Sequence, residues 1–484
     1  MNPHENIILG ILILGTLMGA IDTTIVLLSL PAITEGLHSS LAITIWVILA
    51  YLLVIAIMST QFGRLGDIFG RSRMFNLGFA VFTIGSLLCG LSITDMYLVG
   101  FRIVQAVGGA LMQATSGAII ADTFEVGRRG RAYGYTAMGW NIGGMLGILL
   151  GGVITTFIGW RYIFFINVPI GIVAFALGIK YLTDNPKVEA KTDIIGMVIL
   201  GLALLLISYA AIDFASFGLR LLNIVLLLVG AALVPLFLVY EKRNASPMIK
   251  LEAFKDKVLR NSLFASFFQS LGFLSVAFII IMYLQGIRGL DPFAASLLLV
   301  PGYIVSSFVA PFMGKLSDRF GARIMATLGV GFMAVAVLVY LSIGLSSPYY
   351  IIIVASLITG LGGSLFWPAN SSAVMSSAPH EHYGSTSGLL RLMSNIGTLG
   401  SFVIAITAAT AAIPRNVAFS VFIGTSKLIG GVSSAFLGGV HAALVVCLAI
   451  LFIAGVLSAT RGKEYRQKAN EIARREQRGS ASSA

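Results

Sequence analysis

The chain alternates between long apolar segments and short polar segments along most of its 484 residues. Each apolar segment holds about 20 residues with few charges, which is the length that an α-helix needs to cross a bilayer. The stretch 414–435 is predicted to be a loop, with a re-entrant segment as the alternative. We expect an all-α polytopic membrane protein with fourteen spanning helices, near residues 7–30, 43–61, 74–92, 97–120, 133–157, 162–182, 194–212, 220–240, 261–284, 293–313, 324–345, 349–371, 384–412 and 436–459.

Composition indicates a membrane protein. The chain is 57% hydrophobic and 11% charged, whereas soluble domains carry about 25% charged residues. The run 7–30 follows no basic segment and is too long for a signal peptide, so we expect it to be a transmembrane helix. Cys89 and Cys447 lie in apolar runs and predict neither a disulfide framework nor a metal site.

The distribution of basic residues predicts the orientation. With both termini in the cytoplasm, 25 of the 32 Lys and Arg residues fall on the inner side and five on the outer side. Cytoplasmic loops are enriched in Lys and Arg, so we expect both termini to be cytoplasmic. The net charge of +12 then reflects membrane topology and not a nucleic-acid partner. Arg102 and Arg391 lie within predicted helices.

A short motif occurs twice, in loops that the topology places on the same side of the membrane. "GRLGDIFGRSR" begins at Gly63 after the second helix, and "GKLSDRFGARI" begins at Gly314 after the tenth. Parallel repeats of this kind are typical of secondary transporters that alternate access around a midplane site. The predicted parts are a six-helix bundle at 1–182, an inserted helix pair with cytoplasmic linkers at 183–260, a second six-helix bundle at 261–459 and a basic cytoplasmic tail at 460–484.

Four motifs together resemble the major facilitator superfamily, and more closely its 14-helix drug:proton antiporter family. They are "AIDTTIVLLSLP" from Ala20, the loop motif after the second helix, "RIVQAVGGAL" from Arg102 and "WRYIFFINVPIG" from Trp160. The resemblance spans nearly the whole chain. It implies the major facilitator fold and multidrug efflux across the plasma membrane, driven by protons and carried out by alternating access.

Asp22 is the only acidic residue deep within a predicted span. An acid at that depth is costly and is a functional candidate by default, because a carboxylate in apolar surroundings binds a proton more readily than one in water. Counting along the helices puts Arg102 at a similar depth. We expect Asp22 and Arg102 to form a switchable proton-coupling pair, direct or through Gln105. A static pair that only fixes packing is the alternative.

The loop motif predicts helix contacts on the cytoplasmic side. Gly63 and Gly70 permit tight turns and close approach, and Asp67 is able to accept hydrogen bonds at a neighbouring helix N-terminus. The resemblance implies that this neighbour is helix eleven and that Arg71 pairs with Asp122, as a latch on the outward-facing state. A charged loop that serves only topology is the alternative. The predicted gating residues are Gly63, Asp67, Gly70, Arg71, Asp122, Gly314, Asp318 and Gly321.

The fifth helix carries "GWNIGGMLGILLGG" at 139–152. Glycines at this spacing let helices pack backbone to backbone. The segment resembles the antiporter motif of the family but has Gly144 and Ile148 where the family usually has prolines. Because that motif is associated with exporters, the departure weakens the prediction of antiport. The glycines of the predicted packing motif are Gly143, Gly147, Gly151 and Gly152.

The substrate pocket is predicted from polar and aromatic residues at middle depth. Gln113, Asn141 and Gln269 are the candidate polar contacts, and Phe366 and Trp367 are candidates for an apolar wall. Apolar pockets with few polar anchors suit hydrophobic ligands, whereas ordinary helix packing is the alternative for each residue. Helices nine to fourteen contain no deep acid, which disfavours dicationic drugs. Amphipathic monocations, neutral drugs and weak acids stay open.

Proton-coupled efflux of hydrophobic or amphipathic small molecules is the activity that these features favour. A proton symporter or a uniporter for a metabolite is the alternative, and a membrane-embedded sensor or enzyme is a remote one. The sequence has no GxxxxGK[ST] phosphate loop, so ATP is not expected to be the energy source. We expect no cofactor except the proton as coupling ion, no metal and no nucleic-acid partner. The expected partners are the substrate, protons and the lipid bilayer, and the expected state is a monomer.

Overall fold

A computed structural model describes residues 3–39, 41–44, 46–184, 193–244, 247, 254–412 and 431–462. We call the helices up to Tyr181 the first half and those from Lys257 the second half. The first half contains α1 (Pro3–Gly36), α2 (Leu41–Thr44), α3 (Trp46–Phe69), α4 (Arg71–Gly90), α5 (Asp95–Thr123), α6 (Arg129–Phe157), α7 (Tyr162–Phe165) and α8 (Asn167–Tyr181).

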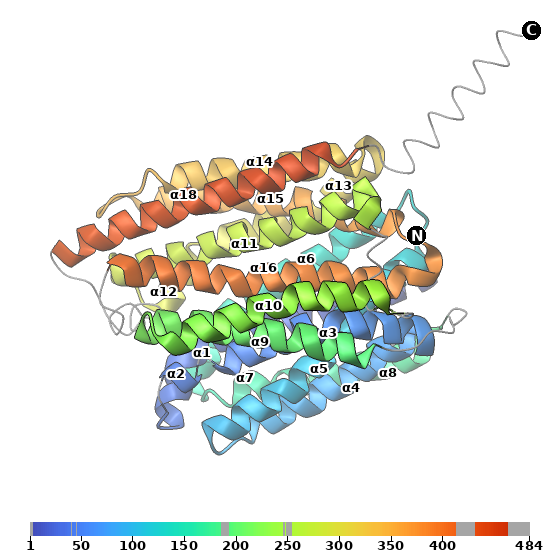
Figure 1. The fold of residues 1–484 in the computed structure, drawn as a ribbon, viewed down its shortest axis with the longest axis horizontal. Helices are drawn as coiled ribbons and strands as arrows, with labels where there is room; N and C mark the ends of the chain where they lie inside the picture. The colour runs from blue at the N-terminus through green and yellow to red at the C-terminus, as the bar shows by residue number, and fades with distance from the viewer. Residues whose placement is uncertain are drawn as a thin grey trace, which may run out of the picture.

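The rest of the described chain is also helical (Figure 1). The inserted pair is α9 (Ile194–Phe217) and α10 (Leu221–Arg243). The second half contains α11 (Lys257–Gly286), α12 (Pro292–Leu297), α13 (Val300–Phe320), α14 (Ala322–Tyr340), α15 (Tyr349–Ser376), η2 (His380–His382), α16 (Tyr383–Ala412) and α18 (Gly431–Thr460).

The described residues form 14 helical spans that are long and apolar enough to cross a membrane, which confirms the predicted number. The sixth span joins α7 to α8, and the tenth joins most of α12 to α13. Most of the stretch 414–435 and nearly all of the tail 460–484 lie outside the described residues. The predicted limits of the four parts of the chain stay predictions.

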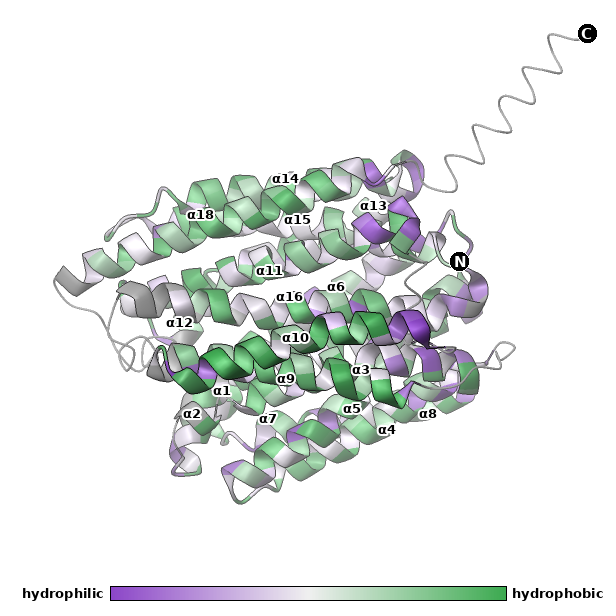
Figure 2. Ribbon diagram, viewed as in Figure 1, coloured by the Kyte–Doolittle hydropathy of each residue, from purple (hydrophilic) through white to green (hydrophobic). Residues whose placement is uncertain are grey.

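The helices α9 and α10 pack on each other, and α9 also contacts α3 and α16. They lie side by side in green near the centre of Figure 1. In Figure 2 α10 is apolar along most of its length and polar at its C-terminal end, where the last turn carries two basic residues. Only 17% of the apolar window of α10 is buried in the protein, so most of this helix presents its side chains to the surroundings of the bundle.

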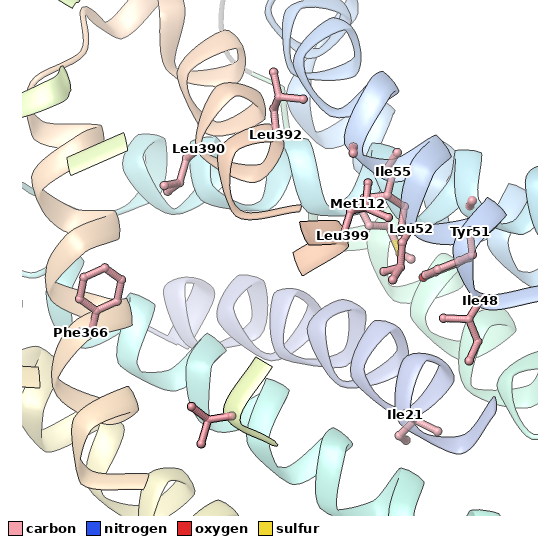
Figure 3. Packing of buried hydrophobic residues seen from close by; sticks show 14 of the residues in the cluster. Ile21, Ile48, Tyr51, Leu52, Ile55, Met112, Phe366, Leu390, Leu392 and Leu399 are labelled. Atoms are coloured by element: carbon pink, nitrogen blue, oxygen red, sulfur yellow. The ribbon is translucent and has the colours of Figure 1, made fainter. Parts of the chain in front are cut away.

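Two helix pairs make the most extensive contacts between the halves: α3 packs along α16, and α6 packs along α13. Buried apolar side chains form one cluster that includes residues of both halves. Figure 3 shows members of this cluster, among them Tyr51 and Met112 from the first half and Phe366 and Leu390 from the second. The halves are therefore in direct contact through apolar side chains as well as through backbone.

Glycines with positive φ separate two pairs of consecutive helices. Gly70, with φ of 109°, lies between α3 and α4, and Gly321, with φ of 93°, lies between α13 and α14. Side chains rarely tolerate such angles, so glycine is the residue that allows the turn. The two turns lie at the end of the bundle where α1 begins and α18 ends, which we call the termini face.

Candidate functional site

Asp22 of α1 and Arg102 of α5 form an ion pair in the interior of the first half. The Nη1 atom of Arg102 donates to Oδ2 of Asp22 at 2.6 Å. The side chains are 0% and 1% exposed. Separating two such charges is expensive because neither has water as a substitute partner.

Three further polar side chains complete the surroundings of the pair. Gln105 donates to Oδ1 of Asp22 at 2.8 Å and accepts from Arg102 at 2.7 Å. It also donates to the hydroxyl of Ser86 at 2.9 Å. Asn167 of α8 donates to Ser86 at 3.1 Å and to Asp22 at 3.4 Å. Asp22 therefore has three donors from α5 and α8 and is fully hydrogen-bonded.

The other side of the Arg102 guanidinium faces α3. Its Nε donates to the carbonyl of Val47 at 2.9 Å, and its Cζ atom lies 4.1 Å from the ring centroid of Tyr51. The Tyr51 hydroxyl is buried and has no hydrogen-bond partner among the described groups. Arg102 thus connects α1, α3 and α5, and any change in the charge of Asp22 acts on all three helices.

The ion pair does not border the central cavity of the protein. That cavity measures about 260 Å³ and is lined by residues of both halves. Helices α1 and α5 reach it through Thr16 and Gln113, whereas Asp22, Arg102 and Gln105 are not part of its lining. The helices α1 and α5 therefore border the cavity, but the ion pair between them does not.

The first loop motif connects the halves at the termini face. Asp67 at the end of α3 accepts hydrogen bonds from the backbone N–H groups of Gly384 and Ser385, at 2.8 and 2.9 Å, and from the Ser385 hydroxyl at 2.8 Å. These groups belong to the first turn of α16, where free N–H groups and the helix dipole favour an anion. We call this set the first latch.

The partner of the first latch corrects a prediction from the sequence. We expected Asp67 to meet helix eleven, which is α14, but it meets the thirteenth span, α16. The inserted helices α9 and α10 precede the second half, so the helix that would be the eleventh span without them is the thirteenth span of this chain. The geometry of the contact is otherwise as expected, with a carboxylate at the N-terminus of a helix from the opposite half.

Arg71 joins the first latch to α5. Its guanidinium donates to Oδ1 of Asp67 at 2.7 and 2.9 Å and to both carboxylate oxygens of Asp122 at 2.5 and 2.6 Å. It also donates to the carbonyl of His380, at 2.7 Å. The imidazole of His380 lies 3.1 Å from Asp122. Arg71 therefore binds two carboxylates of the first half and one carbonyl of the second.

The second loop motif forms an equivalent contact, which we call the second latch. Asp318 at the end of α13 accepts from the backbone N–H groups of Gly130 and Arg131 in the first turn of α6, at 2.9 and 3.0 Å. Ala322 occupies the position that Arg71 has in the first motif. The second latch therefore lacks the arginine that connects the first latch to a second carboxylate.

Small residues let the latches close. A Cβ on Gly63 would lie 2.1 Å from the carbonyl oxygen of Gly384, and one on Gly314 would lie 2.1 Å from that of Gly130. Both distances are far inside van der Waals contact, so the backbones touch. The termini face is closed by direct backbone contact between α3 and α16 and between α6 and α13.

The four glycines of the predicted packing motif lie in α6, the fifth span, and contact two different helices. A Cβ on Gly143, Gly147 or Gly151 would meet α1, with distances of 2.5 Å, 1.9 Å and 3.2 Å to the nearest atoms. A Cβ on Gly152 would instead meet the ring of Phe293 in α12, at 2.7 Å. Three of the four glycines therefore form the contact surface with the helix that carries Asp22.

The cavity contains part of the predicted pocket. Gln113, Asn141 and Trp367 line it. Asn141 donates to the Ser306 hydroxyl at 2.9 Å, which connects α6 to α13 across the cavity. The lining is otherwise mostly apolar, aromatic or hydroxylic, as expected for a site that binds a largely apolar ligand.

Two predicted pocket residues, Gln269 and Phe366, do not line the cavity. Both side chains are fully buried. Gln269 donates toward the sulfur of Met333 at 3.5 Å, and Phe366 packs on Gly329. Both contacts are with α14. A role for these two residues in substrate binding stays a prediction.

Arg391 and Asn395 of α16 line the cavity, and the sequence analysis gave them no role. Arg391 also borders a small adjoining cavity of about 20 Å³. A charged residue inside a predicted span indicates a functional site, whether it is an acid such as Asp22 or an arginine. The sequence therefore contained the signal for Arg391. Asn395 has no comparable signal, because amides are common in helices.

The sequence pattern of the Major Facilitator Superfamily matches residues 12–402. The chain is 32% identical over 399 residues to the riboflavin transporter RibZ of Clostridioides difficile (strain 630), covering 81% of this chain and 85% of that protein. It is 29% identical to the tetracenomycin C resistance and export protein of Streptomyces glaucescens, covering 82% and 74%. Identity to the methylenomycin A resistance protein of Bacillus subtilis (strain 168) is also 29%, covering 81% and 85%.

Solved structures share the arrangement of helices. The crystal structure of the human organic anion transporter MFSD10 (TETRAN) matches with a TM-score of 0.64 at 13% identity, covering 93% of this chain and all of that one. A bacterial homologue of the iron transporter ferroportin, in an outward-facing state, matches with a TM-score of 0.60 at 12% identity, covering 95% and 99%. At these identities the likeness concerns the fold alone.

Proposed function

The chain belongs to the major facilitator superfamily, and from that premise we propose that it exports hydrophobic or amphipathic small molecules in exchange for protons. It is a multi-pass membrane transporter and not an enzyme, so the remote alternative of a sensor or enzyme is excluded. Two relatives that carry the names of antibiotic resistance proteins support the direction of transport. The buried pair of Asp22 and Arg102, separate from the cavity, is the observation that carries the proposal.

Asp22 is the proton site in this proposal. Protonation would remove its negative charge and leave Arg102 with neutral acceptors only, the amide of Gln105 and the carbonyl of Val47. An uncompensated charge at this depth is unfavourable, so the helices that hold Arg102 would move to a new arrangement. Because the pair lies between α1, α3 and α5, its proton would act on the cavity through helix movement and not through contact with the substrate.

The latches give the direction of the cycle. We propose that the termini face is cytoplasmic, in agreement with the excess of basic residues predicted there, and that the closed latches hold the outward-facing state. A proton taken up from outside would favour opening of the latches and release of the proton inside. The proposed protein acts as a monomer in the plasma membrane and uses no cofactor besides the proton.

A symporter or uniporter for a metabolite is the second candidate. It is favoured by Gly144 and Ile148, which replace the usual prolines of the exporter motif, and by the similarity to a riboflavin transporter. Riboflavin is therefore the first metabolite to test. In the exporter the proton moves against the substrate, in a symporter it moves with the substrate, and in a uniporter no proton is coupled.

Inverted membrane vesicles with an imposed proton gradient and a pH-sensitive dye test the proposal. Addition of an exported compound should dissipate the gradient in wild type and in Glu35→Gln, a control at the exposed end of the same helix α1. Asp22→Asn should give no dissipation but should still exchange labelled substrate without a gradient. Uptake of riboflavin by right-side-out vesicles, with no gradient response to any drug, would favour the second candidate.

A further inference from the structure

The described lining of the central cavity includes a positively charged side chain and no negatively charged one. Arg391 lines the cavity, and none of the described residues around it is Asp, Glu, Lys or His. A charged side chain near the middle of a membrane protein is costly and usually has a partner. Arg391 is therefore expected to have a partner of opposite charge or a hydrogen-bond acceptor.

The buried arginines Arg102 and Arg129 have their partners within the protein. Arg102 pairs with Asp22, and Arg129 donates to the carbonyl of Ala121 and to the hydroxyl of Tyr383, at 2.7 and 2.8 Å. Arg391 differs from them, because the structure gives its guanidinium no hydrogen bond and no carboxylate partner among the described residues. Its electrostatic neighbour is the phenol of Tyr133, whose hydroxyl already donates to the carbonyl of Gly117 at 2.8 Å.

A second donor without an acceptor lies one helical turn away. The amide nitrogen Nδ2 of Asn395 is buried and has no hydrogen-bond partner in the described protein. Residues four apart in a helix lie on the same face, and both Arg391 and Asn395 line the cavity. Leaving a buried donor unsatisfied costs free energy. The unsatisfied Asn395 amide next to an arginine that lines the same cavity without an ion-pair partner therefore indicates an acceptor that is not part of the chain.

We propose that Arg391 and Asn395 bind the carboxylate of an amphipathic organic monoanion. An arginine fork matches the two oxygens of a carboxylate, and the Asn395 amide would supply an additional donor to one of them. The proposal rests on the proposed transport function and narrows its substrate to weak acids. One cation without a second nearby selects a single negative charge, and the absence of an acid in the described lining disfavours cations.

The apolar part of the ligand has a matching surface. Trp140, Tyr303 and Trp367 line the same cavity from α6, α13 and α15. Trp140 is 38% exposed, which leaves part of its ring available for stacking on a ligand. An aromatic ring attached to a carboxylate through a short linker combines the two kinds of contact that the cavity offers.

Equilibrium binding to the purified full-length protein in lipid nanodiscs tests this inference without a proton gradient. The probes are 2-naphthaleneacetate, its neutral amide and the cation 2-(2-naphthyl)ethylamine, and the readout is quenching of tryptophan fluorescence at neutral pH. We expect the carboxylate to bind about tenfold or more tightly than the amide, since hydrogen bonds to charged groups are the strong ones. The amine should bind more weakly than either.

The variants separate the charge from the fold. Arg391→Gln should abolish the preference for the carboxylate, Arg391→Lys should keep part of it, and Asn395→Ala should reduce it. Arg243→Gln, at an exposed position in the inserted pair, should leave it unchanged. Thermal unfolding identifies variants that do not fold. If Arg391→Gln does not fold, the binding measured with Arg391→Lys and Asn395→Ala decides the test.

Each result either supports or overturns the inference. Equal affinities for the three probes in wild type would overturn it, and so would a carboxylate preference that survives Arg391→Gln. Loss of that preference in Arg391→Gln but not in Arg243→Gln supports it. If the carboxylate binds through Arg391 while the vesicles show no proton response, the binding site is supported and proton-coupled export is overturned. If the vesicles show proton-coupled export of a cation and the purified protein shows no preference for the carboxylate, export is supported and the binding site is overturned.

Discussion

Asp67 and Asp318 occupy matching positions in the two halves, and each accepts hydrogen bonds from the first turn of a helix in the opposite half. The two latches are not equal, because Asp67 also binds Arg71 whereas Ala322 stands at the matching position of the second motif. The sequence repeat thus produces equivalent closures in the two halves, and the connection through Arg71 belongs to the first motif.

This inequality predicts that the first latch contributes more to closure than the second. Asp67→Asn should open the termini face more than Asp318→Asn, because it also weakens the arginine connection to Asp122. Ser371→Cys, in the cavity lining and in a background with Cys89 and Cys447 replaced, reports the opening by its reaction with a thiol reagent that cannot cross the membrane. Equal labelling in the two aspartate variants would contradict the prediction.

The pair of Arg71 and Asp122 should tolerate an exchange of charges better than either single change. Arg71→Asp and Asp122→Arg each leave like charges in contact at a nearly buried place, so both should lose transport. The double variant should regain part of it. Arg73→Asp is the control, since this arginine is 66% exposed and its ion pair with Asp184 joins atoms 3.3 Å apart. Surface ion pairs contribute about 0–1 kcal/mol, so this change should have little effect.

The hydrophobic pattern predicted the fourteen spans because each span must satisfy its backbone within itself and present apolar side chains. The meeting of Asp22 and Arg102 was also predictable, since depth follows from counting residues along two helices. The pattern does not show rotation about a helix axis. For this reason the sequence did not show that Gln269 and Phe366 contact α14. It also did not show that Asn167 donates to Asp22 or that Ser86 accepts from Gln105.

Breaking the buried ion pair should destabilise the protein more than removing it. Arg102→Met alone leaves the Asp22 carboxylate without its cation and should cost about 3–5 kcal/mol of folding free energy. The double variant Asp22→Asn with Arg102→Met should recover part of that loss, because no charge stays buried. Thermal unfolding in one detergent compares the three proteins. A double variant less stable than the Arg102→Met protein would show that the pair stabilises by more than charge compensation.

Gly147 of α6 should not tolerate a side chain. A Cβ at this position would lie 1.9 Å from the hydroxyl oxygen of Thr24 and 2.8 Å from the carbonyl oxygen of Ile21. Gly147→Ala should therefore push α1 away from α6, lower the unfolding temperature and disturb the Asp22 site. Gly10→Ala is the control on α1, because nothing lies within 4 Å of its added Cβ, and alanine favours a helix over glycine by up to about 1 kcal/mol. Equal stability of the two variants would contradict the close contact between α1 and α6.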